Sequence, residues 1–234
     1  MSEVERLREA AAWYSTDQLD VDRFLVRCRY DAMAPHLVGP KGLELGCADG
    51  EMTQYLLHHF DSLVAVDGAA DLLKSLPSDR RLVTVASLFE DFEPEETFTT
   101  IVLDHILEHV EDPVAIVRRA VRWLDPGGVI VAGVPNAHSF HRLAAVHMGL
   151  LERPNSLNER DVALGHRRVY DALSFRADLC AGGLVVCHHG GVFLKPLANR
   201  QMQSWTVEML EAFARLGSEF PDNAAELYAV CTPA

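Results

Sequence analysis

A run of small and acidic residues near position 46 could hold a nucleoside-containing cofactor. Gly46, Ala48 and Gly50 alternate with other residues in a run that starts at Glu44. Glycine has no Cβ and tolerates a positive φ, so such a loop can turn tightly beside a bulky ligand. Asp67 follows 21 residues after Gly46, at the end of the next apolar stretch. An acid there can accept hydrogen bonds from ribose hydroxyls, although an N-cap for the following helix is the alternative role.

The acids in this loop favour S-adenosylmethionine (SAM) over a dinucleotide. The dinucleotide fingerprint has its third glycine at the position of Glu51, where a carboxylate would oppose a pyrophosphate. SAM has no phosphate, and its sulfonium and amino-acid tail are compatible with nearby acids. An NAD-dependent oxidoreductase is therefore the less favoured alternative. Further cofactor contacts are expected near the ends of the next strands, at Gly68, Ser87, Leu88, Phe89 and Asp104. Residues 87–89 are candidates to flank the adenine, unless they form only a strand-to-loop transition.

Three residues after a later apolar strand carry groups suited to acid–base chemistry. His105, Glu108 and His109 fall at positions i, i+3 and i+4, on one side of a helical turn. Methyl transfer is an SN2 displacement that needs alignment and sometimes a base, and histidine can be that base at neutral pH. We predict His105, His109 and His166 as catalytic candidates. The alternatives are a bracing role for Glu108 and His109, or, less favoured, a divalent metal held by His105, Glu108 and His109.

A second group of polar residues could contact the methyl acceptor. His138 and His141 follow the fifth strand, and Arg167 and Tyr170 follow a segment without clear strand character. Arginine next to histidine in an otherwise acidic protein could recognise an anion such as a carboxylate or a phosphate. The alternative is that such arginines neutralise nearby surface acids.

The apolar pattern predicts the scaffold that would position these residues. Short apolar runs at 42–45, 63–66, 82–86, 101–103 and 129–134 alternate with helical segments, which include 69–76 and 113–124. Alternation of this kind is typical of a parallel sheet covered on both faces. Beyond it, helices are predicted at 171–181 and 200–216, and strands at 184–187 and 227–231.

We predict a single α/β domain over 1–234, with three additions to the sheet. A helical cap is predicted at 1–40, and two insertions at about 136–165 and 194–222 are expected to cover a substrate pocket. Trp13, Tyr14 and Arg29 in the cap could close over the cofactor, although packing explains the two aromatic residues equally well.

Charge and composition narrow the classes of partner. The 21 basic and 34 acidic residues give a net charge of −13, which disfavours nucleic acid and anionic membranes. The five cysteines form no C-x-x-C pair, and no apolar run reaches the roughly 18 residues of a membrane span. We therefore expect a cytoplasmic protein, monomeric or homodimeric, with a small-molecule partner.

Several motifs in order resemble class I SAM-dependent methyltransferases of the small-molecule branch, which includes the ubiquinone-biosynthesis-like and type 11 and 23 methyltransferases. These motifs are the runs at 43–50, 104–113, 124–128, 165–170 and 181–184. The resemblance implies a Rossmann-like, seven-stranded, mostly parallel sheet whose last strand is antiparallel, with helices on both faces. It also implies that Glu44, Gly46, Gly50 and Asp67 bind SAM. Ala48 replaces the middle glycine of the family motif.

The same resemblance bears on metals and on the reaction. Residues 105–109 are similar to a Glu-x-x-Glu-His stretch in magnesium-using O-methyltransferases, but His105 replaces the first glutamate, which disfavours magnesium. We expect SAM as the cofactor and O-methylation of a carboxylate or hydroxyl in the biosynthesis of a natural product or metabolite. The alternatives are a small-molecule N-methyltransferase and a non-catalytic SAM-binding regulatory module.

Overall fold

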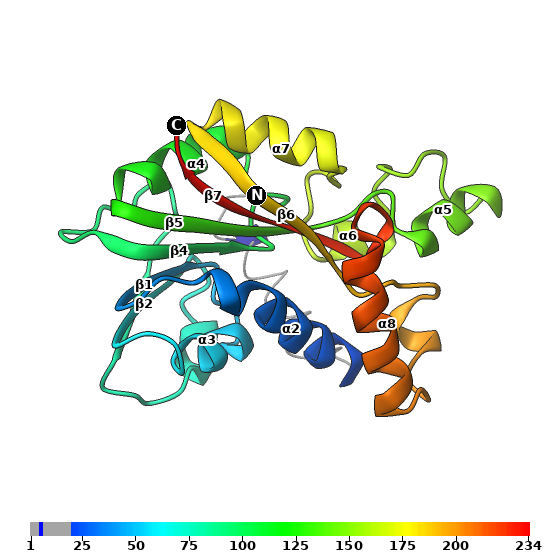
Figure 1. Cartoon of the computed structure of the whole chain (residues 1–234), viewed down its shortest axis with the longest axis horizontal. Coiled ribbons are helices and arrows are strands. Elements are labelled where there is room, and N and C mark those ends of the chain that lie inside the picture. Colours follow the sequence, from blue (N-terminus) through cyan, green and yellow to red (C-terminus); the bar gives the residue numbers. More distant parts are fainter. Residues whose placement is uncertain (1–4, 7–19) are drawn as a thin grey trace.

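A seven-stranded sheet forms the centre of the molecule (Figure 1). The computed structural model describes residues 5–6 and 20–234. The strands are β1 (Lys41–Leu45), β2 (Ser62–Asp67), β3 (Leu82–Ala86), β4 (Phe98–Asp104), β5 (Leu124–Pro135), β6 (Leu184–Val192) and β7 (Glu226–Pro233). Their order is β3-β2-β1-β4-β5-β7-β6. Strands β1 to β5 pair in parallel, whereas β7 is antiparallel to both β5 and β6. The predicted mostly parallel sheet with an antiparallel last strand is confirmed.

The strand order reverses direction between β1 and β4, and this reversal positions the site. Strands β2 and β3 extend from one side of β1, and β4 and β5 extend from the other. A crevice therefore opens at the carboxyl ends of β1 and β4, where open α/β sheets bind ligands. Glu226 begins β7 opposite Pro135, the last residue of β5. The antiparallel direction of β7 thus brings its first residue to the same edge.

Helices cover both faces of the sheet, as predicted (Figure 1). Helices α4 (Pro113–Arg122) and α7 (Ala172–Ala181) lie on one face, and α2 (Asp20–Met33) and α3 (Glu51–Leu56) lie on the other. Two apolar clusters of buried residues match these faces. One contains Leu103 of β4 with Phe175 of α7, and the other contains Val102 of β4 with Leu25 of α2. Successive residues of β4 therefore face opposite halves of the core.

Two segments beyond β5 lie together at the carboxyl edge, at the right of Figure 1. The first contains α5 (Phe140–His147) and α6 (Glu159–Ala163), and the second contains η3 (Asn199–Gln201), α8 (Val207–Glu219) and η4 (Pro221–Asn223). They correspond to the predicted insertions at 136–165 and 194–222. The predicted cap is represented by α2 and η1 (Ala34–His36). Trp13 and Tyr14 lie outside the described residues.

Two predicted helices differ from those in the structure. The segment 69–76 forms only a 3₁₀ turn, η2 (Leu72–Ser75), because Pro77 holds the preceding Leu76 in an extended conformation. The segment predicted at 200–216 divides into η3 and α8. Helix α8 begins late because the Thr206 side chain accepts a hydrogen bond from the Met209 amide and caps it there.

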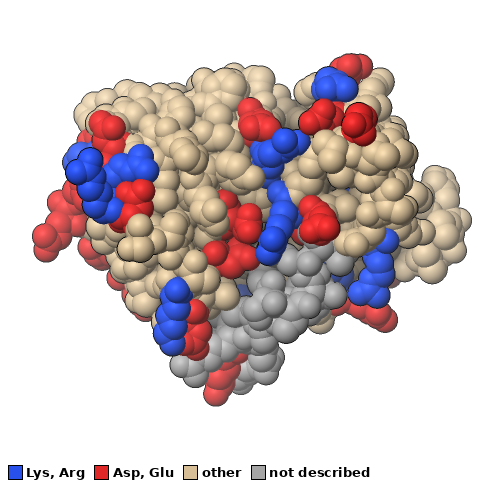
Figure 2. Space-filling view, turned by 90° about the horizontal axis from the view of Figure 1, so that it is seen from below, with Lys and Arg blue, Asp and Glu red and all other residues tan. Residues whose placement is uncertain are grey.

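The surface carries side chains of both charges, as expected from 21 basic and 34 acidic residues. Figure 2 shows basic and acidic side chains side by side across the face that it displays. Among residues 5–6 and 20–234, none of the helices combines the length and apolar character that crossing a bilayer requires.

Helix α7 gives a direct test of this packing. Phe175 is 1% exposed against the sheet, whereas Leu173 on the same helix is 81% exposed. We expect Phe175→Ala to lower the free energy of unfolding by about 3–5 kcal/mol, because the cavity it leaves cannot fully collapse. Leu173→Ala should change it by less than about 0.5 kcal/mol. Urea unfolding monitored by circular dichroism measures both, and equal effects would contradict the assigned face of α7.

Candidate functional site

The loop between β1 and α3 has the backbone conformation expected for close contact with a ligand. Gly46 has a φ of 81°, Ala48 of 44° and Gly50 of 87°. A Cβ built on Gly46 would overlap Cγ2 of Ile106, so this position accepts only glycine without a shift of its neighbour. The Ala48 backbone is left-handed although the residue has a Cβ, which shows that the missing middle glycine leaves the loop geometry intact.

Two buried acids flank the loop. Glu44 is 3% exposed and accepts a hydrogen bond of 2.6 Å from the Thr53 hydroxyl. Burial raises its pKa to about 8, against the effect of that hydrogen bond. The Asp67 carboxylate accepts hydrogen bonds from the amides of Ala48 at 3.0 Å and Ala69 at 2.8 Å. Asp67 thus fixes the loop to the end of β2, and the ribose contact stays a prediction.

A first cavity of about 90 Å³ opens against this loop. Four of the predicted cofactor residues line it, namely Glu44, Gly46, Ala48 and Asp104. The other six predicted cofactor residues are outside its lining: Gly50, Asp67, Gly68, Ser87, Leu88 and Phe89. Two of these residues still lie close to the loop. The Ser87 amide donates to the Asp67 carbonyl at 3.1 Å. Cζ of Phe89 would lie 3.6 Å from a Cβ built on Gly46.

Arg29 of α2 joins three elements at this edge of the sheet. Its Nε donates to Oδ2 of Asp104 at 2.7 Å, and a terminal nitrogen donates to Oε1 of Glu226 at 3.2 Å. The side chains are 13%, 7% and 10% exposed, respectively. Burial opposes the charge on Arg29, but the two carboxylates outweigh burial and raise its pKa. The guanidinium is therefore a permanently charged link between the cap and the ends of β4 and β7.

His105 lies next to this link in a strained conformation. Its φ is 55°, which is uncommon for a residue with a Cβ. Its Nδ1 is 3.4 Å from Oε1 of Glu108, and its Nε2 is 3.6 Å from Oε2 of Glu226. Burial and Arg29 would lower the pKa of His105, but Glu226 and Asp104 outweigh them, so that its pKa is raised above 6.5. The imidazole can thus hold a proton between two carboxylates.

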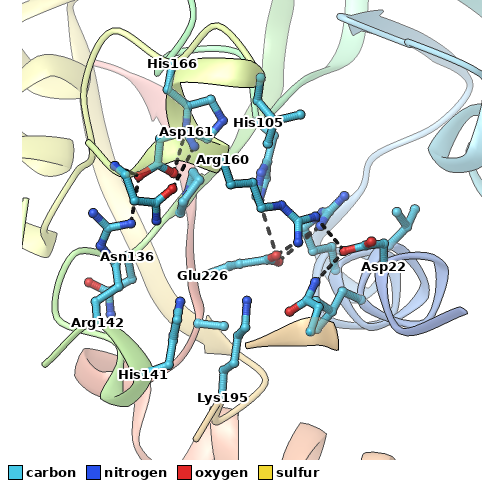
Figure 3. Close-up of a pocket in the computed structure, with 18 residues that line it drawn as sticks. Asp22, His105, Asn136, His141, Arg142, Arg160, Asp161, His166, Lys195 and Glu226 are labelled. Atoms are coloured by element: carbon cyan, nitrogen blue, oxygen red, sulfur yellow. Dashed lines mark hydrogen bonds and ion pairs between the residues drawn. The ribbon is translucent and has the colours of Figure 1, made fainter. Parts of the chain in front are cut away.

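A second cavity, of about 210 Å³, adjoins the first (Figure 3). The two cavities share Val26, Arg29 and His105 in their linings. In Figure 3 the Glu226 carboxylate lies near the centre, with His105 on one side and His141 and Lys195 on the other. The remaining lining residues are Asp22, Leu25, Pro135, Asn136, Arg142, Asn158, Arg160, Asp161, Leu164, His166, Asn199 and Ala225. The cap and both predicted insertions contribute to this wall.

The structure brings only some of the predicted catalytic and acceptor-binding residues to this cavity. His105, His141 and His166 line it. His109 does not, but its ring packs against His166 with centroids 4.7 Å apart. The remaining three candidates are engaged elsewhere: His138, Arg167 and Tyr170.

Those three residues have contacts that explain their positions. His138 is exposed, and its amide donates to the side chain of Asn136. Arg167 is exposed, and its Nε donates to the His109 carbonyl at 2.9 Å. Tyr170 is buried in the core, where its hydroxyl donates to Asp178 at 2.8 Å. Arg167 thus lies outside the lining of the second cavity, and its expected contact with an anion stays a prediction.

The structure brings together a group of possible metal ligands that differs from the predicted group of His105, Glu108 and His109. Glu108, His109 and His166 place one ligand atom each within 4.8 Å of one another. Both carboxylate oxygens of Glu108 are buried without a hydrogen bond. His105 is not a member of this set, although it contacts Glu108. Two imidazoles and one carboxylate suit zinc or another transition ion better than magnesium.

Several residues of the second cavity escaped prediction from the sequence. Arg142 donates to the Pro154 and Ser156 carbonyls and pairs with Asp161 at 3.0 Å, while the Asp161 carboxylate also contacts His166. One local signal was present: Asn158 and Asp161 form a capping box at the start of α6. Arg142, Glu226 and Lys195 carry no comparable local signal, because only the tertiary fold brings them together.

Comparison with known proteins identifies the family. Residues 18–189 match the family described as a methyltransferase domain, and the chain belongs to that family. This confirms the resemblance to the methyltransferase family. Methyl transfer as the activity and SAM as the cofactor stay predictions for this chain.

Curated relatives and solved structures add detail about similar proteins. The chain is 31% identical over 122 residues to a ubiquinone biosynthesis O-methyltransferase of Xanthomonas oryzae pv. oryzae. That match covers 47% of this chain and 49% of the relative, so the chain spans about half the length of the curated relatives it matches.

Two solved structures share the fold at low identity. The N-methyltransferase NodS from Bradyrhizobium japonicum, in complex with S-adenosylhomocysteine (SAH), has a TM-score of 0.61 at 18% identity, covering 100% of this chain and 99% of NodS. A SAM-dependent methyltransferase from Mesorhizobium loti has a TM-score of 0.64 at 16% identity, covering 87% of this chain and 97% of that one.

The glycine loop supplies a test of the cofactor site. Gly46 and Gly127 both have a φ of 81°, but a Cβ on Gly127 would meet nothing within 4 Å. We expect Gly46→Ala to weaken SAH binding at least about ten-fold, equivalent to about 1.4 kcal/mol, because the new methyl group displaces Ile106 and the loop. Gly127→Ala carries the same backbone strain and should leave the affinity unchanged. Isothermal titration calorimetry measures both, and unaltered binding by the Gly46 variant would place the cofactor elsewhere.

Proposed function

We propose that this chain transfers a methyl group from SAM to an oxygen atom of a small-molecule acceptor, by SN2 displacement. The observation that carries the proposal is the pair of adjoining cavities that meet at His105. A displacement on a sulfonium needs the donor and the acceptor in line and in contact. One cavity at the glycine loop and a second that shares His105 with it would place a donor and an acceptor next to each other.

The lining residues support distinct roles for the two cavities. Glu44, Gly46, Ala48 and Asp104 would hold the amino-acid end of SAM, with Asp67 at the ribose. SAM, when bound, supplies an electrophilic methyl group. The acceptor would occupy the second cavity, whose volume of about 210 Å³ suits a small molecule. Ser87, Leu88 and Phe89 would flank the adenine, and this contact stays a prediction, as do the other predicted cofactor contacts.

The surroundings of His105 favour oxygen as the acceptor atom. A hydroxyl group must lose a proton as it is methylated. His105 would take that proton, and Glu226 and Glu108 beside its ring would stabilise the imidazolium that results. A neutral amine needs no base before attack. The names of the curated relatives also point to oxygen, whereas NodS, an N-methyltransferase, keeps nitrogen as the second candidate.

Several wider expectations accompany this proposal. We expect a cytoplasmic enzyme, monomeric or homodimeric, acting in biosynthesis on a natural product or metabolite. A regulatory module that binds SAM without catalysis is the alternative from a different class of protein.

Transfer of a labelled methyl group separates these alternatives. With SAM carrying carbon-13 in its methyl group and an extract of small metabolites, we expect release of SAH and a methoxyl or methyl-ester signal in the product. The carbon shift distinguishes O-methyl from N-methyl products. SAH binding without transfer would support the regulatory module, and NADH binding without SAH binding would refute the proposal. The Gly46→Ala protein is the matched negative control.

The role of His105 can be tested without disturbing its backbone. Asparagine tolerates a left-handed conformation better than most residues, so His105→Asn keeps the loop while removing the titrating ring. With the acceptor identified above, we expect kcat to fall about a hundred-fold or more, with unchanged SAH affinity. His138→Asn, at an exposed site, should behave like the native protein.

The pH dependence provides a second readout for His105. The base form is the neutral imidazole, and the pKa of His105 is raised above 6.5. The rate should therefore rise with pH through that raised pKa, and the His105→Asn protein should lose this limb of the profile. If the His105→Asn protein keeps the rise of rate with pH, or has a kcat close to that of the native protein, another group performs the proton transfer.

A further inference from the structure

Charges in the second cavity are paired with one exception. Its lining contains four basic side chains and three carboxylates. Three ion pairs account for six of these seven groups: Arg29 with Glu226, Arg142 with Asp161, and Arg160 with Asp22. The seventh group is Lys195. No hydrogen bond or ion pair joins its ammonium to any residue in the described part of the chain.

The backbone at Lys195 is held by contacts to neighbouring elements. It follows the end of β6, where Phe193 has a φ of 58° and is fully buried. The left-handed turn at Phe193 directs the chain toward the cavity, and the Leu194 amide donates to the Phe213 carbonyl of α8 at 2.8 Å. The Lys195 carbonyl in turn accepts a hydrogen bond of 3.1 Å from the His141 amide. These contacts hold the backbone that carries the ammonium.

His141 provides a second polar group at the same place. In Figure 3 its ring and the Lys195 side chain lie side by side and point into the cavity. Its Nδ1 is buried without a hydrogen-bond partner. Burial, and next the charge of Lys195, lower the pKa of His141 to about 2. The neutral ring can donate one hydrogen bond, so an ammonium and an imidazole N–H are available to one ligand.

We propose that Lys195 and His141 form a subsite for a carboxylate group of the acceptor, on the opposite side of Glu226 from His105. The single ammonium without a carboxylate partner matches a monoanion, whereas a phosphate dianion would bring a second negative charge that this ammonium cannot compensate. The carboxylate has two oxygens and can accept from both donors. The inference rests on the proposed function and specifies its acceptor: a molecule with a hydroxyl at one end and a carboxylate at the other.

The state of the Lys195 amine agrees with this assignment. Burial, and then the charge of Arg160, lower the pKa of Lys195 to about 8. A bound carboxylate supplies the missing counter-ion and should raise that pKa again. Binding of a carboxylate above pH 8 should therefore be accompanied by uptake of a proton.

Benzoate and benzamide are suitable probes, because they have nearly the same shape and differ in charge. We expect the SAH-loaded protein to bind benzoate but not benzamide, as measured by calorimetry. Lys195→Met should weaken benzoate binding at least about ten-fold while SAH affinity is retained, and Lys195→Arg should restore much of it. Lys74→Met, at a side chain that is 77% exposed, is the matched control. Equal binding of benzoate by the native and Lys195→Met proteins would overturn the proposal.

A measurement on the native protein keeps the test valid if the Lys195→Met protein fails to fold. Acetylation by acetic anhydride, followed by mass spectrometry, gives the reaction rate of each lysine. Benzoate should protect Lys195 and leave Lys74 unaffected, and benzamide should protect neither. Equal rates at Lys195 with and without benzoate would refute the subsite. Because neither experiment requires turnover, loss of the subsite is distinguishable from failure of the proposed function, which shows as absent SAH binding or absent methyl transfer.

Discussion

The Arg29 guanidinium is the interaction on which the arrangement of this site depends. It binds Asp104 at the end of β4 and Glu226 at the start of β7, and it belongs to α2 of the cap. Burying a charge has a desolvation cost that its ion pairs offset only when the partners are well placed. Removing one partner leaves the remaining buried charge uncompensated. Asp104 immediately precedes His105, and Glu226 contacts its ring. The interaction that docks the cap therefore also orients the proposed base.

Backbone strain is concentrated where the two cavities meet the sheet. Among the residues that the structure describes, three with a Cβ have a positive φ, and two of these are Ala48 and His105. Such conformations persist only where surrounding contacts hold them. The Ala48 amide is bound by Asp67, and the His105 amide donates to the Gly133 carbonyl at 2.9 Å. A Cβ at Gly133 would overlap the Asp104 carboxylate, so this glycine leaves space for the acid that Arg29 binds.

The scaffold was more predictable from the sequence than the acceptor pocket, for a physical reason. Continuous apolar runs and the glycine loop are local patterns, and they were sufficient for the strand positions, the sheet class and four residues that line the first cavity. The second cavity is built from α2, the residue after β4, α5, α6, the segment 195–199 and the start of β7, which are distant in sequence. Arg167 is informative here: its neighbour in sequence, His166, lines the cavity, but the arginine itself binds a backbone carbonyl. Their positions in the sequence provide no ground for deciding which of the two would line the cavity.

The distribution of charge within the molecule bears on how an acceptor would be selected. The chain as a whole carries −13, so its surface repels anions at long range. In the cavity lining the arginines are already paired with carboxylates, and Lys195 is the one basic side chain without such a partner among the described residues. A mere excess of negative charge on the ligand would therefore be unfavourable. Selection would instead depend on whether one carboxylate reaches Lys195 while the reacting oxygen reaches His105, which is a requirement on the length and geometry of the acceptor.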